Sequence, residues 1–122
     1  MKRSHVFLAL LGLLLPSLAH ADLTVKVYQE LLQGSPAERT IVQNYVGGVA
    51  KGYLWANIAL AQKGQSPLFC FKGDLDTAQA NQIAAEALAQ ALFMNLKNDT
   101  PVEMLLLLRL QKKYPCAPGK TP

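Results

Sequence analysis

The longest uninterrupted helical pattern in the chain is SPAERTIVQNYVGGVAKGYLWANIALAQ, residues 35–62. It opens with Ser35-Pro36-Ala37-Glu38, where a hydroxyl can cap the first turn, proline suits the first helical position and a glutamate follows three residues after the cap. It stops before Lys63-Gly64, a cation and a glycine that suit a helix end. The stretch therefore predicts one long helix over 36–62, against which the rest of a small chain must pack.

Two further helix starts have the same chemistry. Thr100-Pro101-Val102-Glu103 repeats the hydroxyl, the proline and the glutamate, and it predicts a helix over 101–114 that Pro115 stops. Asp76-Thr77-Ala78-Gln79 is a simpler version and predicts a helix over 77–96. In the predicted helix over 101–114, the run Met104-Leu105-Leu106-Leu107-Leu108 leaves little polar surface. We therefore expect this last helix to pass through the centre of a bundle.

The segment 23–33 is ambiguous, because Leu23, Val25 and Val27 alternate and would also suit a strand. We favour a helix there. The helix over 77–96 carries apolar residues spaced for a buried face: Ile83, Ala87, Leu88, Ala91, Leu92 and Met94. The fold class expected from these patterns is all-α, a small four- to five-helix bundle with one disulfide.

Small residues form a stripe on the long helix, where Gly48, Gly52 and Ala56 recur every four residues and Ala59 follows three further on. A glycine costs about 1 kcal/mol relative to alanine inside a helix, so two of them on one stripe imply a gain in packing or binding. Another helix can approach closely there.

Three aromatic residues stand beside this stripe: Tyr45, Tyr53 and Trp55. Aromatic side chains usually lie in the core or in the walls of a groove. We therefore interpret these three residues as core or groove walls. Asn57 is the polar exception on this part of the helix. It either faces solvent or, if buried, must be hydrogen-bonded, and loop backbone is the expected partner.

The N-terminus decides the expected compartment. Lys2 and Arg3 precede the apolar run 6–15, and Ala19-His20-Ala21 offers small residues for cleavage. Residues 1–21 are therefore predicted to be a secretory signal peptide, and the mature chain is expected in the periplasm. The run is too short for a membrane helix, so no membrane partner is expected after cleavage.

Cleavage after Ala21 leaves 101 of the 122 residues and removes Lys2, Arg3 and both histidines, His5 and His20. The 12 basic residues fall to 10 against 8 acidic ones, too small an excess to indicate a nucleic-acid partner. Nucleophilic centres that need an imidazole have no base. We therefore expect no catalytic residue and no cofactor. We also expect no metal site, because zinc ligands come in close-spaced pairs and the two cysteines of this chain are far apart.

Two cysteines in an exported domain favour a disulfide between Cys70 and Cys116. A reactive pair would have the Cys-x-x-Cys spacing, which is absent. Closing the intervening loop would stabilise the fold by about 4 kcal/mol in the chain-entropy model. The bond would tie the end of the last helix to the loop 63–75, and residues 117–122 are predicted to be a disordered tail.

The loop 63–75 mixes large apolar groups with turn-forming residues. Its two phenylalanines, Phe69 and Phe71, either plug the core or contact a partner. The acidic residues Asp74 and Asp76 are interpreted as helix-capping groups. The candidate partner-binding residues of the loop are Lys63, Gln65, Ser66, Phe69, Phe71 and Lys72.

Taken in order, Tyr45-x-x-Gly48-x-x-x-Gly52 followed by Trp55-Ala56-Asn57, then Leu68-Phe69-Cys70, and finally Tyr114-Pro115-Cys116 resemble a known family. The resemblance is to the amidase-immunity and related periplasmic immunity proteins of type VI secretion, and it spans nearly all of residues 22–116. Where the family often has Cys-Pro-Pro after the loop phenylalanine, this chain has Cys70-Phe71-Lys72. We therefore carry over no toxin-contacting residue.

The resemblance implies an all-helical, often dimeric periplasmic protein. Such a protein binds a toxin that is a peptidoglycan-cutting amidase and plugs the active-site cleft of that toxin. Inhibition of that kind needs no catalytic group from the inhibitor. The expected partners are thus a protein toxin and, for a homodimer, a second copy of the chain. The alternative is a periplasmic helical chaperone or stress-related binding protein, which would expose apolar surface when its carboxylates are protonated.

Overall fold

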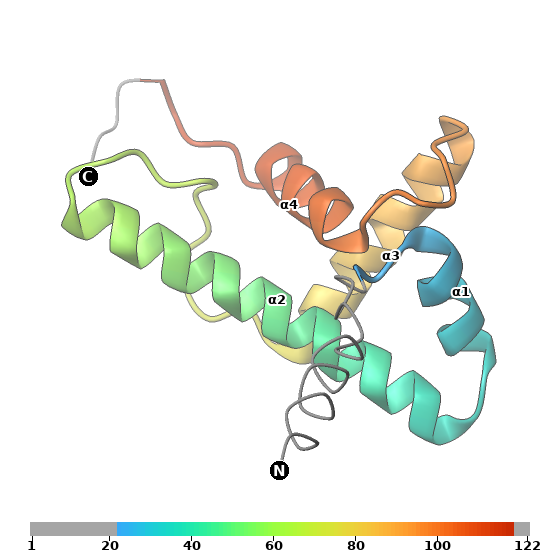
Figure 1. The fold of residues 1–122 in the computed structure, drawn as a ribbon. Helices are drawn as coiled ribbons and strands as arrows, with labels where there is room; N and C mark the ends of the chain where they lie inside the picture. The colour runs from blue at the N-terminus through green and yellow to red at the C-terminus, as the bar shows by residue number, and fades with distance from the viewer. Residues whose placement is uncertain (1–21, 119–122) are drawn as a thin grey trace, which may run out of the picture.

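The computed structural model describes residues 22–118, and this part of the chain folds into four helices without a strand. The helices are α1 (Val25–Gln33), α2 (Pro36–Gln62), α3 (Thr77–Phe93) and α4 (Val102–Lys113). The all-α prediction is confirmed. The longest helix, α2, runs across the molecule, and α1 folds back beside its first half (Figure 1). Residues 1–21, predicted to be a signal peptide, and residues 119–122 of the predicted tail lie outside the described residues.

The capping predictions for α2 and α3 are confirmed. The Ser35 hydroxyl accepts the Glu38 N–H at 3.3 Å, and the Glu38 carboxylate accepts the Ser35 N–H at 2.7 Å. These hydrogen bonds hold the pKa of Glu38 below its ordinary value. Asp76 and Gln79 form the same reciprocal pair at the start of α3. Each box satisfies two backbone donors that helix geometry leaves unpaired.

The start of α4 differs from the prediction. Among the described residues, no side chain caps α4, and Thr100 uses its carbonyl instead, which accepts the Val25 N–H at 2.9 Å. The Val102 N–H in turn donates to the Leu23 carbonyl at 2.8 Å. This short antiparallel pairing joins the starts of α1 and α4. It also explains why the predicted helix over 23–33 begins only at Val25, with Thr24 as its cap.

The end of α3 lies three residues before the predicted one. Asn95 adopts a positive φ of 53°, a conformation that asparagine tolerates better than other side chains. The Leu96 N–H reaches back to the Ala91 carbonyl at 3.0 Å and satisfies the helix end. The chain then turns toward α4.

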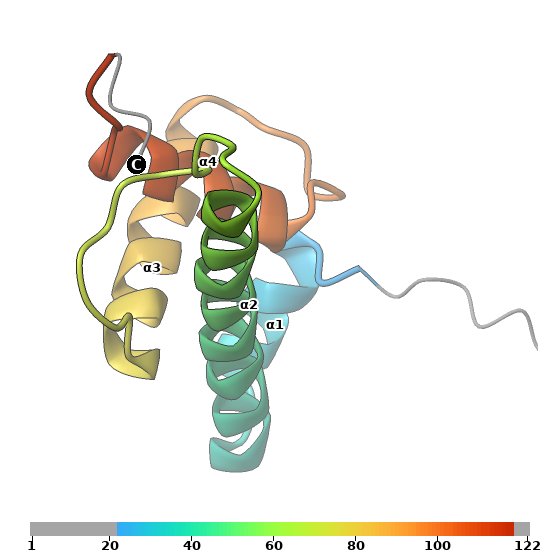
Figure 2. The ribbon, with the colours of Figure 1, turned by 90° about the vertical axis from the view of Figure 1, so that its left-hand side faces the viewer.

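In the view turned by 90°, α3 and α1 lie on opposite sides of α2 (Figure 2). The core between the helices is dominated by small and aliphatic residues, with two large aromatic side chains, Tyr28 and Phe69. Four alanines of α3 are buried: Ala80, Ala84, Ala87 and Ala91. The close approach of α2 to α3 occurs at Gly47, where an added Cβ would lie 2.7 Å from Thr77 Oγ1.

The prediction that α4 passes through the centre of the bundle is wrong. Leu105, Leu106 and Leu110 are buried, but Met104 and Leu108 are 46% and 53% exposed, so only one face of α4 packs. Leu92 and Met94, predicted on the buried face of α3, are also exposed. As for membrane insertion, the described helices include none with the length and apolarity needed to cross a bilayer.

Candidate protein-binding surface

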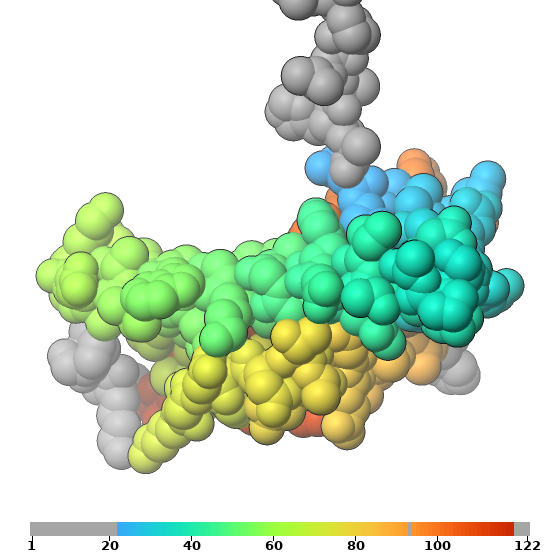
Figure 3. All heavy atoms as spheres, turned by 90° about the horizontal axis from the view of Figure 1, so that it is seen from below, coloured from blue at the N-terminus to red at the C-terminus, as the bar shows by residue number. Residues whose placement is uncertain are grey.

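One face of α2 carries an exposed stripe whose members alternate four and three residues apart. They are Ile41, Tyr45, Gly48, Gly52, Trp55 and Ala59, which we call the α2 stripe. Figure 3 shows α2 uncovered along this face, with α3 beside it. Ile41 is 65% exposed and Trp55 is 68% exposed. The two glycines therefore lie between Ile41 and Tyr45 on one side and Trp55 on the other.

The glycines of the α2 stripe have no packing partner in the described part of the chain. Apart from the adjacent residues and the backbone of α2 itself, a Cβ added at Gly48 or at Gly52 would meet no described atom within 4 Å. The helix-packing gain that the sequence predicts at these two positions is therefore absent within the described chain. Gly47, which the prediction passed over, is the glycine at a helix contact. What remains at Gly48 and Gly52 is open backbone surface.

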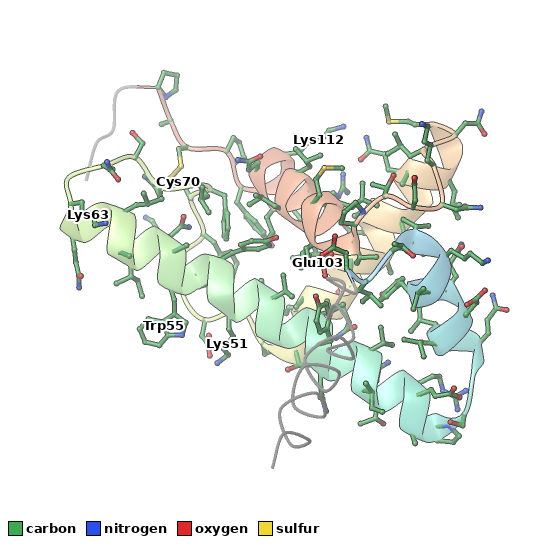
Figure 4. All side chains as sticks on the ribbon, viewed as in Figure 1. Lys51, Trp55, Lys63, Cys70, Glu103 and Lys112 are labelled. Carbon is green, nitrogen blue, oxygen red and sulfur yellow. A yellow bond between two sulfur atoms is a disulfide. The ribbon has the colours of Figure 1, made fainter. Side chains whose placement is uncertain are left out.

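A groove of about 240 Å³ lies beside the α2 stripe, between α2 and the loop 63–76. Its lining residues, which define the Trp55 groove, are Lys51, Leu54, Trp55, Asn57, Ile58, Phe71, Gly73 and Asp74. Trp55 and Lys51 stand on the side of α2 turned away from α4 (Figure 4). Trp55 thus belongs both to the α2 stripe and to the groove, as the wall that the sequence predicted and not as core.

Asn57 holds the loop against α2. Its Nδ2 donates to the Phe69 carbonyl at 2.9 Å, and its Oδ1 accepts the Leu68 N–H at 2.6 Å. The side chain is half-buried. The prediction that a buried Asn57 bonds to loop backbone is confirmed, and the pairing of both backbone groups fixes the loop in one register.

A disulfide between Cys70 and Cys116 holds the same loop from the other side, as predicted. The Cys70 N–H also donates to the Tyr114 carbonyl at 2.8 Å, and the Phe71 ring packs edge-on against the Tyr114 ring, with centroids 4.8 Å apart. The loop is thus joined to α2 and to the segment after α4.

The two phenylalanines of the loop have different roles. Phe69 is 1% exposed and plugs the core, so its place among the candidate partner-binding residues is wrong. Phe71 is half-buried and lines the Trp55 groove. The remaining loop candidates are exposed: Lys63, Gln65, Ser66 and Lys72. Ala56, the other residue of the helix motif, is half-buried.

Three residues of the Trp55 groove were not predicted from the sequence: Lys51, Ile58 and Asp74. Asp74 is not a cap, because its carboxylate pairs with Lys51 Nζ at 3.2 Å across the groove. Both groups are exposed, so the pair contributes little stability. A 23-residue separation gives no local signal for such a pair, whereas Ile58 follows exposed Trp55 by three residues, a helical spacing that places both on one side of α2.

Two tyrosines of α2 reach the start of α4. The Tyr53 hydroxyl donates to the Glu103 carbonyl at 2.8 Å, and the Tyr45 hydroxyl donates to the Glu103 carboxylate. The hydrogen bond to Glu103, with a smaller contribution from burial, raises the pKa of Tyr45 to about 12. Tyr45 is thereby held in one orientation at the edge of the α2 stripe.

Within residues 22–118, no group of three or more His, Cys, Asp or Glu side chains is placed to hold a metal ion. Comparisons of the chain with protein-family models, with curated proteins and with solved structures found no match. The resemblance to immunity proteins therefore rests on the quoted motifs alone.

Proposed function

We propose that this chain is a periplasmic immunity-type protein that binds and blocks a peptidoglycan-amidase-like toxin of type VI secretion. The observation that carries the proposal is the exposed aromatic Trp55 at the junction of an uncovered helix face and a doubly anchored loop. Tryptophan is enriched among the few residues that dominate the binding energy of protein interfaces.

Preorganisation supports the same reading. The Asn57 hydrogen bonds and the disulfide already fix the loop before any partner arrives, so binding loses less conformational entropy in ordering it. An inhibitor that acts by filling a cleft benefits from such rigidity. The exposed cations Lys63 and Lys72 on the loop favour a toxin surface that is acidic around its cleft.

The test begins by reading the gene next to the one for this chain; if it encodes a secreted cell-wall amidase, that amidase is purified. Purified wild-type chain should inhibit peptidoglycan hydrolysis by this amidase at a one-to-one ratio. Trp55→Ala should raise the dissociation constant at least tenfold, because truncating a central aromatic anchor costs on the order of 2 kcal/mol. Calorimetry gives the affinity directly.

Leu108→Ala is the matched control, since Leu108 is similarly exposed at 53% but lies on α4. It should leave inhibition unchanged. An amidase that binds neither protein, or hydrolysis unaffected by excess wild-type chain, would overturn the proposal. Equal loss in both variants would place the contact away from the Trp55 groove.

A second copy of the chain fits the middle of the α2 stripe. The alternating spacing of four and three residues is the spacing at which two helices pack side by side, and Gly48 and Gly52 allow their backbones to approach. We include this homodimer in the proposal. Light-scattering mass measurement should give a dimer for the wild type and a monomer for Gly48→Leu. Ala85→Leu, at an exposed position of α3, is the control and should remain dimeric.

A further inference from the structure

A second groove, separate from the Trp55 groove, lies between α3 and α4 and has a volume of about 310 Å³. We call it the α3–α4 groove, and its lining residues are Ala87, Gln90, Ala91, Met94, Leu96, Met104, Leu105, Leu108, Arg109 and Lys112. Four of the large apolar members are between 41% and 60% exposed, which leaves the apolar floor open to solvent: Met94, Leu96, Met104 and Leu108. Contiguous exposed apolar side chains that line a groove are one mark of a ligand-binding site.

The lining changes character along the groove. On α4 the residues that face it one turn apart are Met104, Leu108 and Lys112, so two apolar turns are followed by a cationic one. On α3 the order is reversed, with Gln90 before Met94. Glu86 fixes the relative direction of the helices, because it lies against the second half of α4. The groove therefore has a polar end and an apolar end.

The polar end is cationic. None of the lining residues is acidic. Arg109 donates to Glu86 at 2.9 Å and is held at the groove edge by this ion pair. In the part of the chain that the structure describes, no carboxylate forms an ion pair with Lys112. Lys112 lies on the far side of α4 from α2, where solvent reaches it (Figure 4).

We infer that the α3–α4 groove binds a single-chain amphiphile with an anionic head, such as a long-chain carboxylate. The apolar end receives the chain, and Lys112 with Arg109 pairs with the carboxylate. Methionine side chains suit such a ligand, because they are flexible and polarizable and adapt to a chain without fixed shape. The charge of the rim selects an anionic head over a cationic one.

The size of the groove selects one chain. Its volume lies at the lower limit of ligand pockets, which begin at roughly 300 Å³, so it has no room for a two-chain lipid. The site is independent of the proposed immunity function, because it shares no residue with the Trp55 groove or the α2 stripe. Failure of either proposal leaves the other standing.

The test is calorimetric titration of the full mature chain with dodecanoate, below its critical micelle concentration, and with dodecyltrimethylammonium as the probe of opposite charge. Wild-type protein should bind dodecanoate with a one-to-one stoichiometry and bind the cation more weakly. Lys112→Glu should weaken dodecanoate binding by roughly fivefold or more and reverse the preference between the two probes. Amide chemical shifts should change in α3 and α4.

Two controls separate this site from general adsorption. Lys26→Glu makes the same charge change at an exposed position of α1 and should bind dodecanoate as the wild type does. Leu108→Gln should weaken both probes, whereas Ile41→Gln, at an exposed position of α2, should weaken neither. Binding at many equivalents, equal affinity for the two probes, or shift changes centred on α2 would overturn the inference.

Discussion

Asn57 is hydrogen-bonded to the backbone of Phe69, with 2.9 Å between Asn57 Nδ2 and the Phe69 carbonyl oxygen. The N–H of the neighbouring residue, Leu68, donates to Asn57 Oδ1. Together the two bonds position the buried ring of Phe69, which enters the core at this point of the loop. One amide side chain therefore connects the helix that carries the α2 stripe to the loop that walls the Trp55 groove.

Replacing Asn57 with alanine should destabilise the fold by about 2 kcal/mol, because it leaves one donor and one acceptor of the loop without their partner. Urea unfolding followed by circular dichroism gives the free energy of unfolding. Asn44→Ala, at an exposed position of the same helix, should change that free energy by less than about 0.5 kcal/mol. Equal effects from the two substitutions would contradict the role assigned to Asn57.

Two adjacent glycines should respond in opposite directions to alanine. At Gly47 the new Cβ would lie 2.7 Å from Thr77 Oγ1 and 3.0 Å from Thr77 Cγ2, so the Thr77 side chain or the α2–α3 packing must shift. At Gly48 it would meet no described atom within 4 Å outside the adjacent residues and the backbone of α2, and alanine is favoured over glycine in a helix by about 1 kcal/mol. We expect Gly47→Ala to lower the free energy of unfolding by about 1 kcal/mol and Gly48→Ala to raise it. Thermal melts at a protein concentration low enough to dissociate the proposed dimer check the order of the two.

Local chemistry explains why most of the fold was predictable from sequence. Ser35 with Glu38, and Asp76 with Gln79, are capping pairs whose partners lie three residues apart, and both form. Thr100 failed as a cap because its segment pairs with Leu23, a contact between distant parts of the chain. Signals confined to one helical turn could not reveal that pairing.

The candidate surface divides in the same way. Trp55 as a groove wall was predicted from its residue type, and the disulfide from the predicted export of the chain. The hydrogen bonds of Asn57 were predicted from the cost of burying an unpaired amide. The packed face of α2 could not be predicted in this way, because the sequence alone does not distinguish Gly47 from Gly48. Only the position of Thr77 shows which of the two glycines is packed. Exposure of Met104 and Leu108 was missed because a leucine-rich run conceals which side of a helix is covered.

Reduction of the disulfide should destabilise the protein by up to about 4 kcal/mol, the loop-closure value for its 46-residue separation. Dithiothreitol should therefore move the urea midpoint of the wild type to lower concentration. The double variant Cys70→Ala, Cys116→Ala should unfold at that lower midpoint with or without the reductant. A wild-type midpoint indifferent to reductant would mean that the crosslink does not form in the purified protein.

The Tyr45 hydrogen bond predicts how stability changes in alkali. The pKa of Tyr45 rises from 10.0 to about 12 in the folded chain, because the hydroxyl donates to Glu103 and ionisation would break that bond. A raised pKa means that the folded state holds the proton more tightly than the unfolded state. The stabilisation from this bond is therefore complete below pH 10 and is lost as the pH rises toward 12.

Tyr45→Phe isolates this effect, because Tyr28 and Tyr53 also have raised pKa values and will contribute to any alkaline loss. At neutral pH the variant should be less stable than the wild type by about 1 kcal/mol, the usual value of one hydrogen bond. The difference between the two proteins should shrink as both are unfolded in urea at increasing pH above 10. Tyrosine absorbance titration of the folded wild type should show one more late-ionising group than the variant. A constant difference across the alkaline range would show that Tyr45 does not hold its proton through Glu103.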